Sequence, residues 1–351
     1  MNILFAITGI AFALFVAFLF SFDRKKIDFK KTLIMIFIQV LIVLFMMNTT
    51  IGLTILTALG SFFEGLINIS KAGINFVFGD IQNKNGFTFF LNVLLPLVFI
   101  SVLIGIFNYI KVLPFIIKYV GIAINKITRM GRLESYFAIS TAMLNIFSAL
   151  IIASVINPYK SDDTDVEIDN LTKSTETKTL NGKTGKPKKV AFFQMIGDSA
   201  MDGFKIAVVV AVMLLAFISL MEAINIMFGS VGLNFKQLIG YVFAPIAFLM
   251  GIPWSEAVPA GSLMATKLIT NEFVAMLDFK NVLGDVSART QGIISVYLVS
   301  FANFGTVGII VGSIKGISDK QGEKVASFAM RLLLGSTLAS IISGSIIGLV
   351  L

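Results

Sequence analysis

Long apolar stretches, separated by short charged turns, run through most of the sequence. A helix needs about 20 consecutive apolar residues to cross a bilayer, and several stretches are close to that length. The simplest predicted spans cover residues 2–21, 32–48, 87–110, 205–227 and 332–351. This pattern predicts an all-α polytopic membrane protein.

Three further segments differ from a simple span. Residues 51–78 mix apolar residues with glycine, Glu64 and Lys71, which favours an amphipathic helix at the membrane interface over a span. Residues 111–132 keep a helical apolar spacing among basic residues, which favours an amphipathic cytoplasmic helix over a basic loop. Residues 159–189 are polar, acidic in the first half and basic in the second, and are predicted to form a flexible cytoplasmic linker or a regulatory docking segment.

Basic residues indicate which turns face the cytoplasm. The dense basic turn between Arg24 and Lys31 is therefore predicted to be cytoplasmic, which places the N-terminus outside. No basic region precedes the first apolar segment, so we expect a retained span and not a cleaved signal peptide. A second basic group predicts another cytoplasmic turn before the last span; it consists of Lys315, Lys320, Lys324 and Arg331.

The apolar run over residues 238–278 is unusual because it contains a break and several polar residues. Its middle is interrupted at Pro253–Ala257, so we expect two short helices joined as a re-entrant hairpin. The second half of the run carries Lys267, Asn271 and Glu272. Ionisable side chains at membrane depth are costly and usually mark a substrate or ion path. Non-helical backbone at that depth is tolerated only where protein or a water-filled cavity covers it.

The next predicted span, residues 291–313, contains Asn303 and Gly305 near its middle. We expect its helix to be interrupted there. A hairpin, a broken span and a final span, in that order, are what one half of an inverted-repeat transporter contains.

Three motifs in this region resemble those of the concentrative nucleoside transporters, the cation-coupled nucleoside symporters of bacteria and animals. They are Gly251-Ile-Pro-Trp-Ser-Glu-Ala257, Ala265-Thr-Lys-Leu-Ile-Thr-Asn-Glu-Phe-Val-Ala-Met276 and Ser300-Phe-Ala-Asn-Phe-Gly-Thr306. The resemblance covers nearly the whole chain. It implies a nucleoside transporter that uses a sodium or proton gradient by alternating access, without a covalent step. It also implies a multi-pass protein of the bacterial inner or plasma membrane that assembles as a homotrimer.

Composition narrows the possible functions further. The chain has 351 residues, of which 56% are hydrophobic and 14% are charged, whereas a soluble domain carries about a quarter charged residues. Histidine and cysteine are absent, and no nucleophile–base or metal-ligand pattern supports an intramembrane enzyme. The net charge of +8 comes from basic residues that flank apolar spans, so nucleic acid is not an expected partner.

The candidate substrate residues lie in the two broken segments. Glu272 is the strongest, because a carboxylate can accept hydrogen bonds from ribose hydroxyls, and the resemblance implies that it binds the ribose; the alternative is a structural pair with Lys267. Asn303 offers both a donor and an acceptor, and the resemblance implies nucleoside contact there, with Phe301 near the same pocket. By itself, Phe301 would be expected in the core. Asn271 either satisfies backbone groups at the break or contacts the substrate.

Several positions differ from the family pattern or have a second interpretation. Thr306 and Gly305 stand where the family usually has serine, and the hydroxyl group of Thr306 still permits ribose contact. Pro253, Trp254 and Glu256 form the predicted hairpin tip. We favour Glu256 as a cap of a half-helix N-terminus over a gating contact, because carboxylates are stabilised at such ends.

The first half of the chain lacks part of the matching repeat. Residues 130–135 resemble the segment that leads into the first hairpin of the family, whereas residues 144–148 and 156–159 resemble the end of the second span that follows it. Between them, near Met143, a hairpin tip with a Gly-Gln-Ser/Thr-Glu motif and one span are missing. Charge supports this interpretation, because both flanks of the single span predicted at 136–156 are expected to be cytoplasmic. A single span cannot have both ends on one side, so either this segment bends back as a hairpin or one half of the protein is inverted.

The resemblance implies that the missing hairpin would carry the base-recognition residues and surround the sodium site, so the sequence assigns no coupling-ion site. A transport-impaired membrane protein of the same fold is therefore the alternative function. The predicted fold is a nucleoside-transporter-type inverted repeat with an incomplete first repeat. Its parts are N-terminal scaffold spans at 1–110, a remnant of the first transport repeat at 111–158, the linker at 159–190, and a C-terminal core at 191–351.

Overall fold

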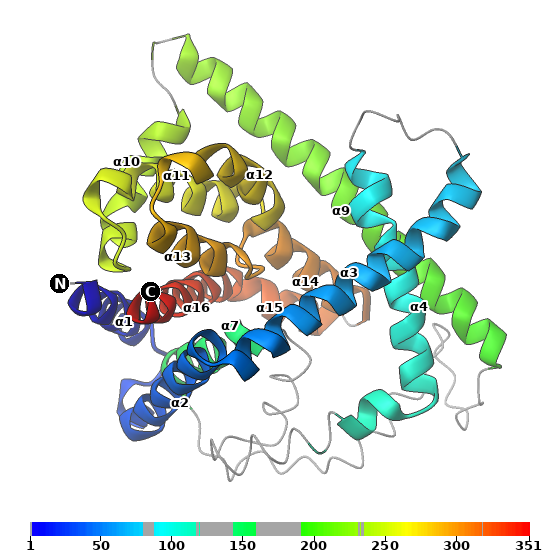
Figure 1. The fold of residues 1–351 in the computed structure, drawn as a ribbon, viewed down its shortest axis with the longest axis horizontal. Coiled ribbons are helices and arrows are strands. Elements are labelled where there is room, and N and C mark those ends of the chain that lie inside the picture. The colour runs from blue at the N-terminus through cyan, green and yellow to red at the C-terminus, as the bar shows by residue number, and fades with distance from the viewer. Residues whose placement is uncertain are drawn as a thin grey trace. The chain divides into compact units, whose positions relative to one another are not determined.

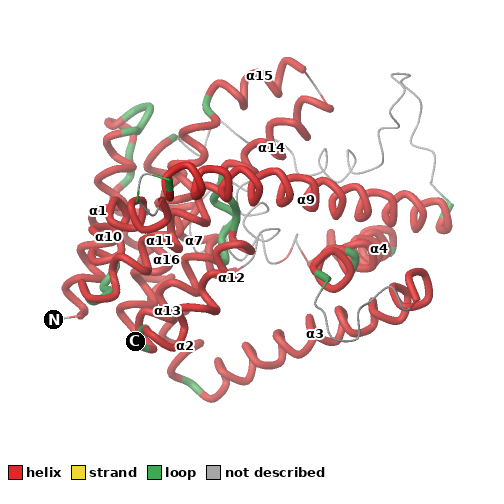
Figure 2. Tube along the Cα trace, turned by 90° about the horizontal axis from the view of Figure 1, so that it is seen from above, coloured by secondary structure: helices red, strands yellow, loops and turns green. Residues whose placement is uncertain are grey.

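The computed structural model describes residues 2–79, 88–116, 119, 143–158, 191–230, 232, 235–317 and 319–351. Across these residues the chain folds as helices joined by short turns (Figure 1). The described part of the chain contains helices and loops but no strand (Figure 2). The predicted all-α architecture is therefore confirmed.

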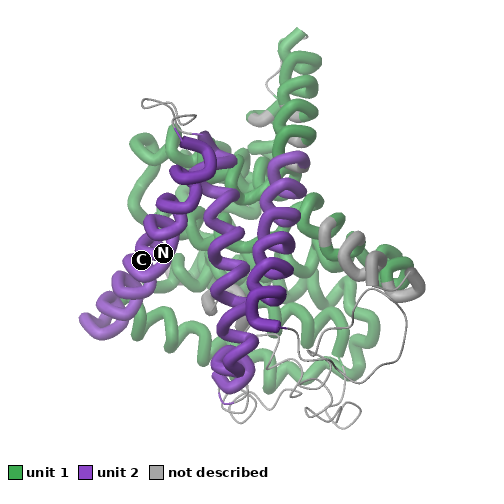
Figure 3. Tube along the Cα trace, turned by 90° about the vertical axis from the view of Figure 1, so that its right-hand side faces the viewer, with its two compact units in different colours: residues 1–47, 141–160, 214–351 green, residues 48–140, 161–213 purple. Residues whose placement is uncertain are grey.

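The chain divides into two compact units, each described here by itself (Figure 3). Unit 1 comprises residues 1–47, 141–160 and 214–351. Unit 2 comprises residues 48–140 and 161–213.

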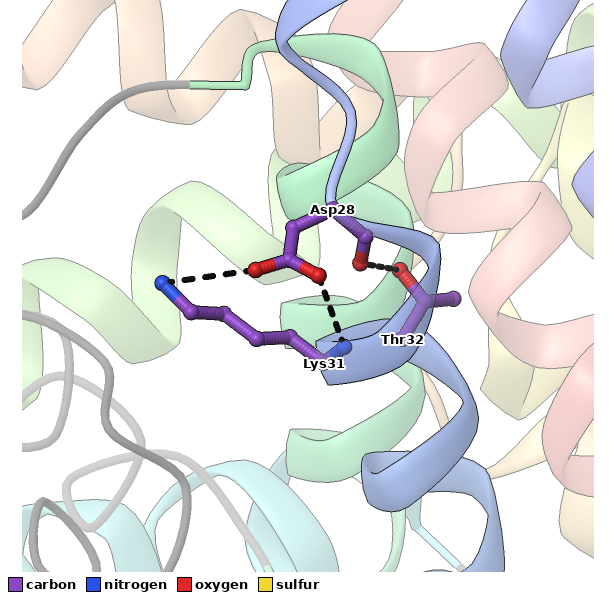
Figure 4. A network of polar contacts seen from close by, with 3 residues as sticks. All are labelled: Asp28, Lys31 and Thr32. Carbon is purple, nitrogen blue, oxygen red and sulfur yellow. Dashed lines mark hydrogen bonds and ion pairs between the residues drawn. The ribbon is translucent and has the colours of Figure 1, made fainter.

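The N-terminal helices of unit 1 are α1 (Asn2–Leu19) and α2 (Phe29–Asn48), joined by a short 3-10 turn at Arg24–Lys26. Asp28 fixes where α2 begins (Figure 4): its Oδ1 accepts a hydrogen bond of 3.1 Å from the backbone N–H of Lys31. The Lys31 ammonium lies 3.8 Å from the other carboxylate oxygen, and the Thr32 hydroxyl donates to the Asp28 carbonyl. Aspartate is a preferred residue at this position because its side chain satisfies a free N–H of the first turn.

The last helix, α16 (Ala329–Val350), is the most buried helix of unit 1 and contacts α1, α7 (Met143–Ile156) and α13 (Ala288–Leu298). Its small residues allow close approach, as is common for helices packed in membranes. A buried polar cluster joins it to the N-terminal helices: Ser343 of α16 and Gln39 of α2 both donate to the Ser148 hydroxyl of α7, at 2.8 Å and 2.7 Å. All three residues are buried, so each partner satisfies the others.

Two helices of unit 1 form the bent pair that the sequence predicts around Pro253. Helices α10 (Phe235–Leu249) and α11 (Trp254–Ile269) are bent by 116° at this break, as a re-entrant hairpin or a broken span would be. Gly251 takes a φ of +98° in the turn, a conformation that favours glycine. The pair packs closely because Gly261 lies directly against the backbone at Gly240.

The predicted hairpin contains a second helix break, which the sequence analysis did not predict. Helix α11 ends at Ile269, and α12 (Glu272–Val282) begins after Thr270 and Asn271. A 3-10 turn at Leu283–Asp285 then leads to α13. The hairpin predicted over 238–278 is therefore three helices, and its polar residues lie at the second break.

The predicted interruption of the following span is confirmed. Helix α13 ends at Leu298, and α14 (Phe304–Ile317) begins six residues later. Helix α15 (Asp319–Ser327) connects α14 to α16. Most of the amphipathic helix predicted at 111–132, the first part of the span at 136–156 and the linker at 159–189 lie outside the described residues.

Unit 2 contains α3 (Thr50–Phe78), a π-helix at Phe90–Leu94 that leads into α4 (Pro96–Tyr109), and residues 192–213 of α9 (Phe192–Gly229). Within it, α3 packs against the π-helix and α4 through a small apolar cluster that includes Ile74, Leu91 and Leu95.

Among the described residues, five helices are long and apolar enough to cross a membrane, and the bent pair raises this to six if it counts as one span. The five are Phe29–Asn48, Thr50–Phe78, Phe90–Tyr109, Phe192–Gly229 and Ala329–Val350. The chain is thus a multi-pass membrane protein. Helix α3 is one of these five, so its length and composition fit a span as well as the interfacial helix that the sequence favoured for residues 51–78.

Candidate functional site

Two helix breaks of unit 1 bring Glu272 and Asn303 into contact. Glu272 is the first residue of α12, and Asn303 directly precedes α14. The Asn303 amide nitrogen, Nδ2, donates a hydrogen bond of 2.8 Å to Oε2 of Glu272. These two candidates of the sequence are 31 residues apart, and the fold places their side chains together.

Asn271 builds the break that precedes Glu272. Its backbone is extended, and its Oδ1 accepts a hydrogen bond of 2.9 Å from the N–H of Val274, which caps the start of α12. On the other side, the Thr270 hydroxyl donates to the Thr266 carbonyl and satisfies the end of α11. Asn271 therefore serves the backbone at the break, which is one of the two roles that the sequence left open for it.

Asn303 has the same capping role at the second break. Its Oδ1 accepts a hydrogen bond of 2.7 Å from the N–H of Thr306, in the first turn of α14. The two ends of one amide thus hold the start of α14 and the Glu272 carboxylate. The side chain is buried, so its position is well defined by these two bonds.

The surroundings of Glu272 favour a carboxylate that accepts hydrogen bonds. It lies in the first turn of α12 and touches the residue before α14, so two helix N-termini meet around it. Helix N-termini stabilise negative charge. A carboxylate has about four lone-pair positions, and its partners here are the Asn303 amide, at Oε2, and the backbone of Glu272 itself. Acceptor capacity remains for hydroxyl groups of a ligand.

Lys267 interacts electrostatically with Glu272, but the hydrogen bonds of its ammonium group go to other residues. Its side chain is fully buried, and its ammonium donates to the Tyr297 carbonyl at 2.5 Å, to the Ser300 hydroxyl at 2.5 Å and to the Ser340 hydroxyl at 3.1 Å. The ammonium also lies 4.2 Å from the centre of the Tyr297 ring. The cation is held by neutral oxygen atoms and an aromatic ring.

The other candidates of the second break lie near this pair in sequence. Phe301 is 65% exposed within unit 1, so it is not the core residue that its type alone would predict. Thr306 is half-buried in the first turn of α14 and is connected to Asn303 through its own N–H. Gly305 is buried beside it.

The hairpin-tip residues lie away from the Glu272–Asn303 pair. Glu256 and Thr270 are at opposite ends of α11, roughly 20 Å apart at 1.5 Å per residue. Glu256 Oε2 accepts hydrogen bonds from the Ser287 hydroxyl at 2.9 Å and from its N–H at 3.2 Å, where Ser287 caps α13. Pro253 precedes α11, and the Trp254 ring packs edge-on against Phe248. The Glu256 carboxylate thus contacts a helix N-terminus, as the sequence analysis favoured. The helix that it contacts is α13.

Three residues that contact Lys267 were not predicted as site residues from the sequence: Tyr297, Ser300 and Ser340. Ser300 lies in the Ser300–Thr306 motif, so a signal for it was present. Ser340 lies in a uniform apolar span, and nothing in the sequence pattern separates it from the other serines of α16.

Comparison with known proteins connects this arrangement to membrane transport. The family described as "Na+ dependent nucleoside transporter C-terminus" matches residues 137–348, and its N-terminal counterpart matches residues 8–81. The chain is 30% identical to the purine nucleoside transport protein NupG of Bacillus subtilis, with 99% of each protein covered. It is 27% identical to the nucleoside permease NupC of Helicobacter pylori, covering 99% of the chain and 97% of that protein.

A solved structure shares the fold over the whole chain. It is described as CNTnw in an inward-facing substrate-bound state, with a TM-score of 0.84 and 25% sequence identity, covering 100% of this chain and 98% of that one. The NupG alignment spans 410 positions and this chain has 351 residues, so at least 59 positions carry no residue of this chain. These unmatched positions are enough for the missing hairpin and span predicted from the sequence.

Proposed function

Since the chain belongs to the Na+-dependent, concentrative nucleoside transporter family, we propose that this nucleoside transporter works as a nucleoside:cation symporter by alternating access. It is a multi-pass protein of the cell membrane and not an enzyme. The observation that supports the proposed site is the contact between Glu272 and Asn303 across two helix breaks. Irregular backbone at such breaks is where transporters of this type bind substrate.

In the proposed binding mode, the ribose hydroxyls donate hydrogen bonds to the Glu272 carboxylate. Asn303 holds that carboxylate in place and offers its amide to the same ligand. The exposed ring of Phe301 packs against the nucleoside, and the Thr306 hydroxyl contacts the ribose. Asn271 supports the site by capping α12.

Sodium is the proposed coupling ion, because the matched family is described as Na+ dependent; a proton is the competing possibility. The resemblance also supports assembly as a homotrimer. The transport-impaired alternative draws on the 59 or more alignment positions without a counterpart. It is not favoured, because 99% of the chain aligns with transport proteins.

Uptake by purified protein in liposomes tests the proposal. Radiolabelled uridine and adenosine are offered under an inward sodium gradient, an inward proton gradient and no gradient, with protein-free liposomes as the control. We expect uptake that an inward sodium gradient increases. Equal uptake under all three conditions would reject symport.

A second experiment distinguishes the proposed symporter from the transport-impaired alternative. A Gly-Gln-Ser-Glu hairpin and one span are inserted after Met143, the position at which the sequence predicts the gap. Uptake only after this insertion would establish the transport-impaired form. No binding of any nucleoside by either form would reject the proposed substrate class.

A further inference from the structure

We propose that Lys267 is a positioning residue for the nucleoside site: it holds the two helix breaks in register without touching the nucleoside. This inference rests on the proposed function, because it concerns the same Glu272–Asn303 pair. Its basis is the set of partners that surround the buried ammonium group.

Each partner of Lys267 belongs to an element that matters for the site. Tyr297 lies in the last turn of α13, Ser300 lies in the break between α13 and α14, and Ser340 lies on α16. An ammonium has three N–H donors, and each finds an oxygen acceptor here. Ser300 and Ser340 also hydrogen-bond to each other, so the cluster is continuous.

The contact with Tyr297 fixes where α13 ends. The last four carbonyl groups of a helix have no partner within the helix, and a cation near a helix C-terminus is stabilised by the helix dipole. The Lys267 ammonium supplies the charge and a hydrogen bond at this end, where the Ser300 hydroxyl also donates to the Tyr297 carbonyl. The chain then leaves α13 at a fixed point, and Asn303 follows Ser300 by three residues.

The other end of the same side chain is covalently part of α11. From Lys267, the chain reaches the break at Thr270 and then Glu272 within five residues. Lys267 is therefore a direct connection between the segment that carries Glu272 and the segment that carries Asn303. The buried hydroxyl of Ser340 anchors this connection to α16, the most buried helix of unit 1.

Fold stability alone does not account for a lysine here. A buried cation without a carboxylate in contact carries a desolvation cost, and replacing buried charges by apolar residues of similar volume is often neutral or stabilising. The site is fully buried and lined by neutral oxygen atoms. The lysine gives directed hydrogen bonds to three separate segments, which an apolar side chain cannot give.

The test is Lys267→Met, with uridine and adenosine binding measured by calorimetry on the purified full chain. Calorimetry reports both the dissociation constant and the fraction of protein that binds. We expect the dissociation constant to rise about tenfold or more, the effect of losing one hydrogen bond to a charged group in the site, with the binding fraction unchanged. Lys280→Met is the matched control, because Lys280 is an exposed lysine of α12; it should match the unaltered chain.

The outcomes separate the two proposals. A reduced binding fraction with an unchanged dissociation constant, or no change at all, would mean that Lys267 only supports the fold. If Lys267→Met fails to fold, the same measurement is made on Ser300→Ala and Ser340→Ala, because each variant removes one acceptor of the ammonium. A raised dissociation constant with an unchanged binding fraction supports the positioning role. If the unaltered chain binds neither nucleoside, the proposed function fails and this inference fails with it.

Discussion

Replacement of Glu272 by glutamine tests the central contact of the proposed site. The change keeps the size of the side chain but replaces one carboxylate oxygen by an amide group that donates. The Asn303 amide nitrogen donates to this side chain at 2.8 Å, so the remaining oxygen of the glutamine is drawn towards Asn303. The amide group then faces the ligand and presents donors to ribose hydroxyls that need an acceptor.

The size of the effect follows from the bonds that are lost. A hydrogen bond to a charged group contributes about 1.5–3 kcal/mol, and about 1.4 kcal/mol corresponds to a tenfold change in affinity. We therefore expect Glu272→Gln to weaken nucleoside binding roughly ten- to a hundredfold. Loss of a second ribose contact would move the result towards the upper end of this range.

Calorimetry or equilibrium binding of radiolabelled nucleoside to detergent-purified protein measures the change. Glu323→Gln is the control, because it removes the same charge from an exposed position on α15. Size-exclusion elution and thermal unfolding show whether each variant is folded. An unaltered affinity in a folded Glu272→Gln protein would refute the assigned role and make Glu272 a structural residue of the α12 N-terminus.

Two further predictions concern the fold and the topology. Gly261→Ala should lower the thermal unfolding temperature, because its Cβ would lie 2.5 Å from the Gly240 carbonyl oxygen and overpacking costs about 1–3 kcal/mol; Gly284→Ala, which meets nothing within 4 Å, should not. A single cysteine placed in the linker at residues 159–189 should resist impermeant thiol reagents in intact cells and react after lysis, because the linker is predicted to be cytoplasmic. Labelling in intact cells would reverse that assignment, and the cysteine-free sequence provides a clean background.

The positions of the helix breaks could be predicted well from the sequence because their causes are local. Pro253 cannot extend the helix before it, and the structure bends the chain there by 116°. Asn303 and Gly305 interrupt an apolar run, and the structure ends α13 and begins α14 around them. The break at Thr270 and Asn271 was harder to separate, because it lies within an otherwise regular helical pattern.

The partners across the breaks could not be predicted from spacing. Asn303 lies 31 residues from Glu272, and Ser340 lies 73 residues from Lys267. The short spacing between Lys267 and Glu272 instead made an ion pair between them plausible. In the fold the two charges interact, but the ammonium donates its hydrogen bonds to three oxygen acceptors on elements that come later in the chain.

The separation of these two charged groups has a consequence for recognition. If Lys267 contacted Glu272, its N–H groups would occupy the lone pairs that ribose hydroxyls need. Because neutral oxygen atoms accept the hydrogen bonds of the ammonium, the carboxylate accepts from the Asn303 amide and from its own backbone and keeps acceptor capacity for a ligand. The N-termini of α12 and α14 stabilise the negative charge together with the nearby charge of Lys267. The breaks that interrupt the two helices thereby supply the electrostatic support that leaves Glu272 free for a ligand.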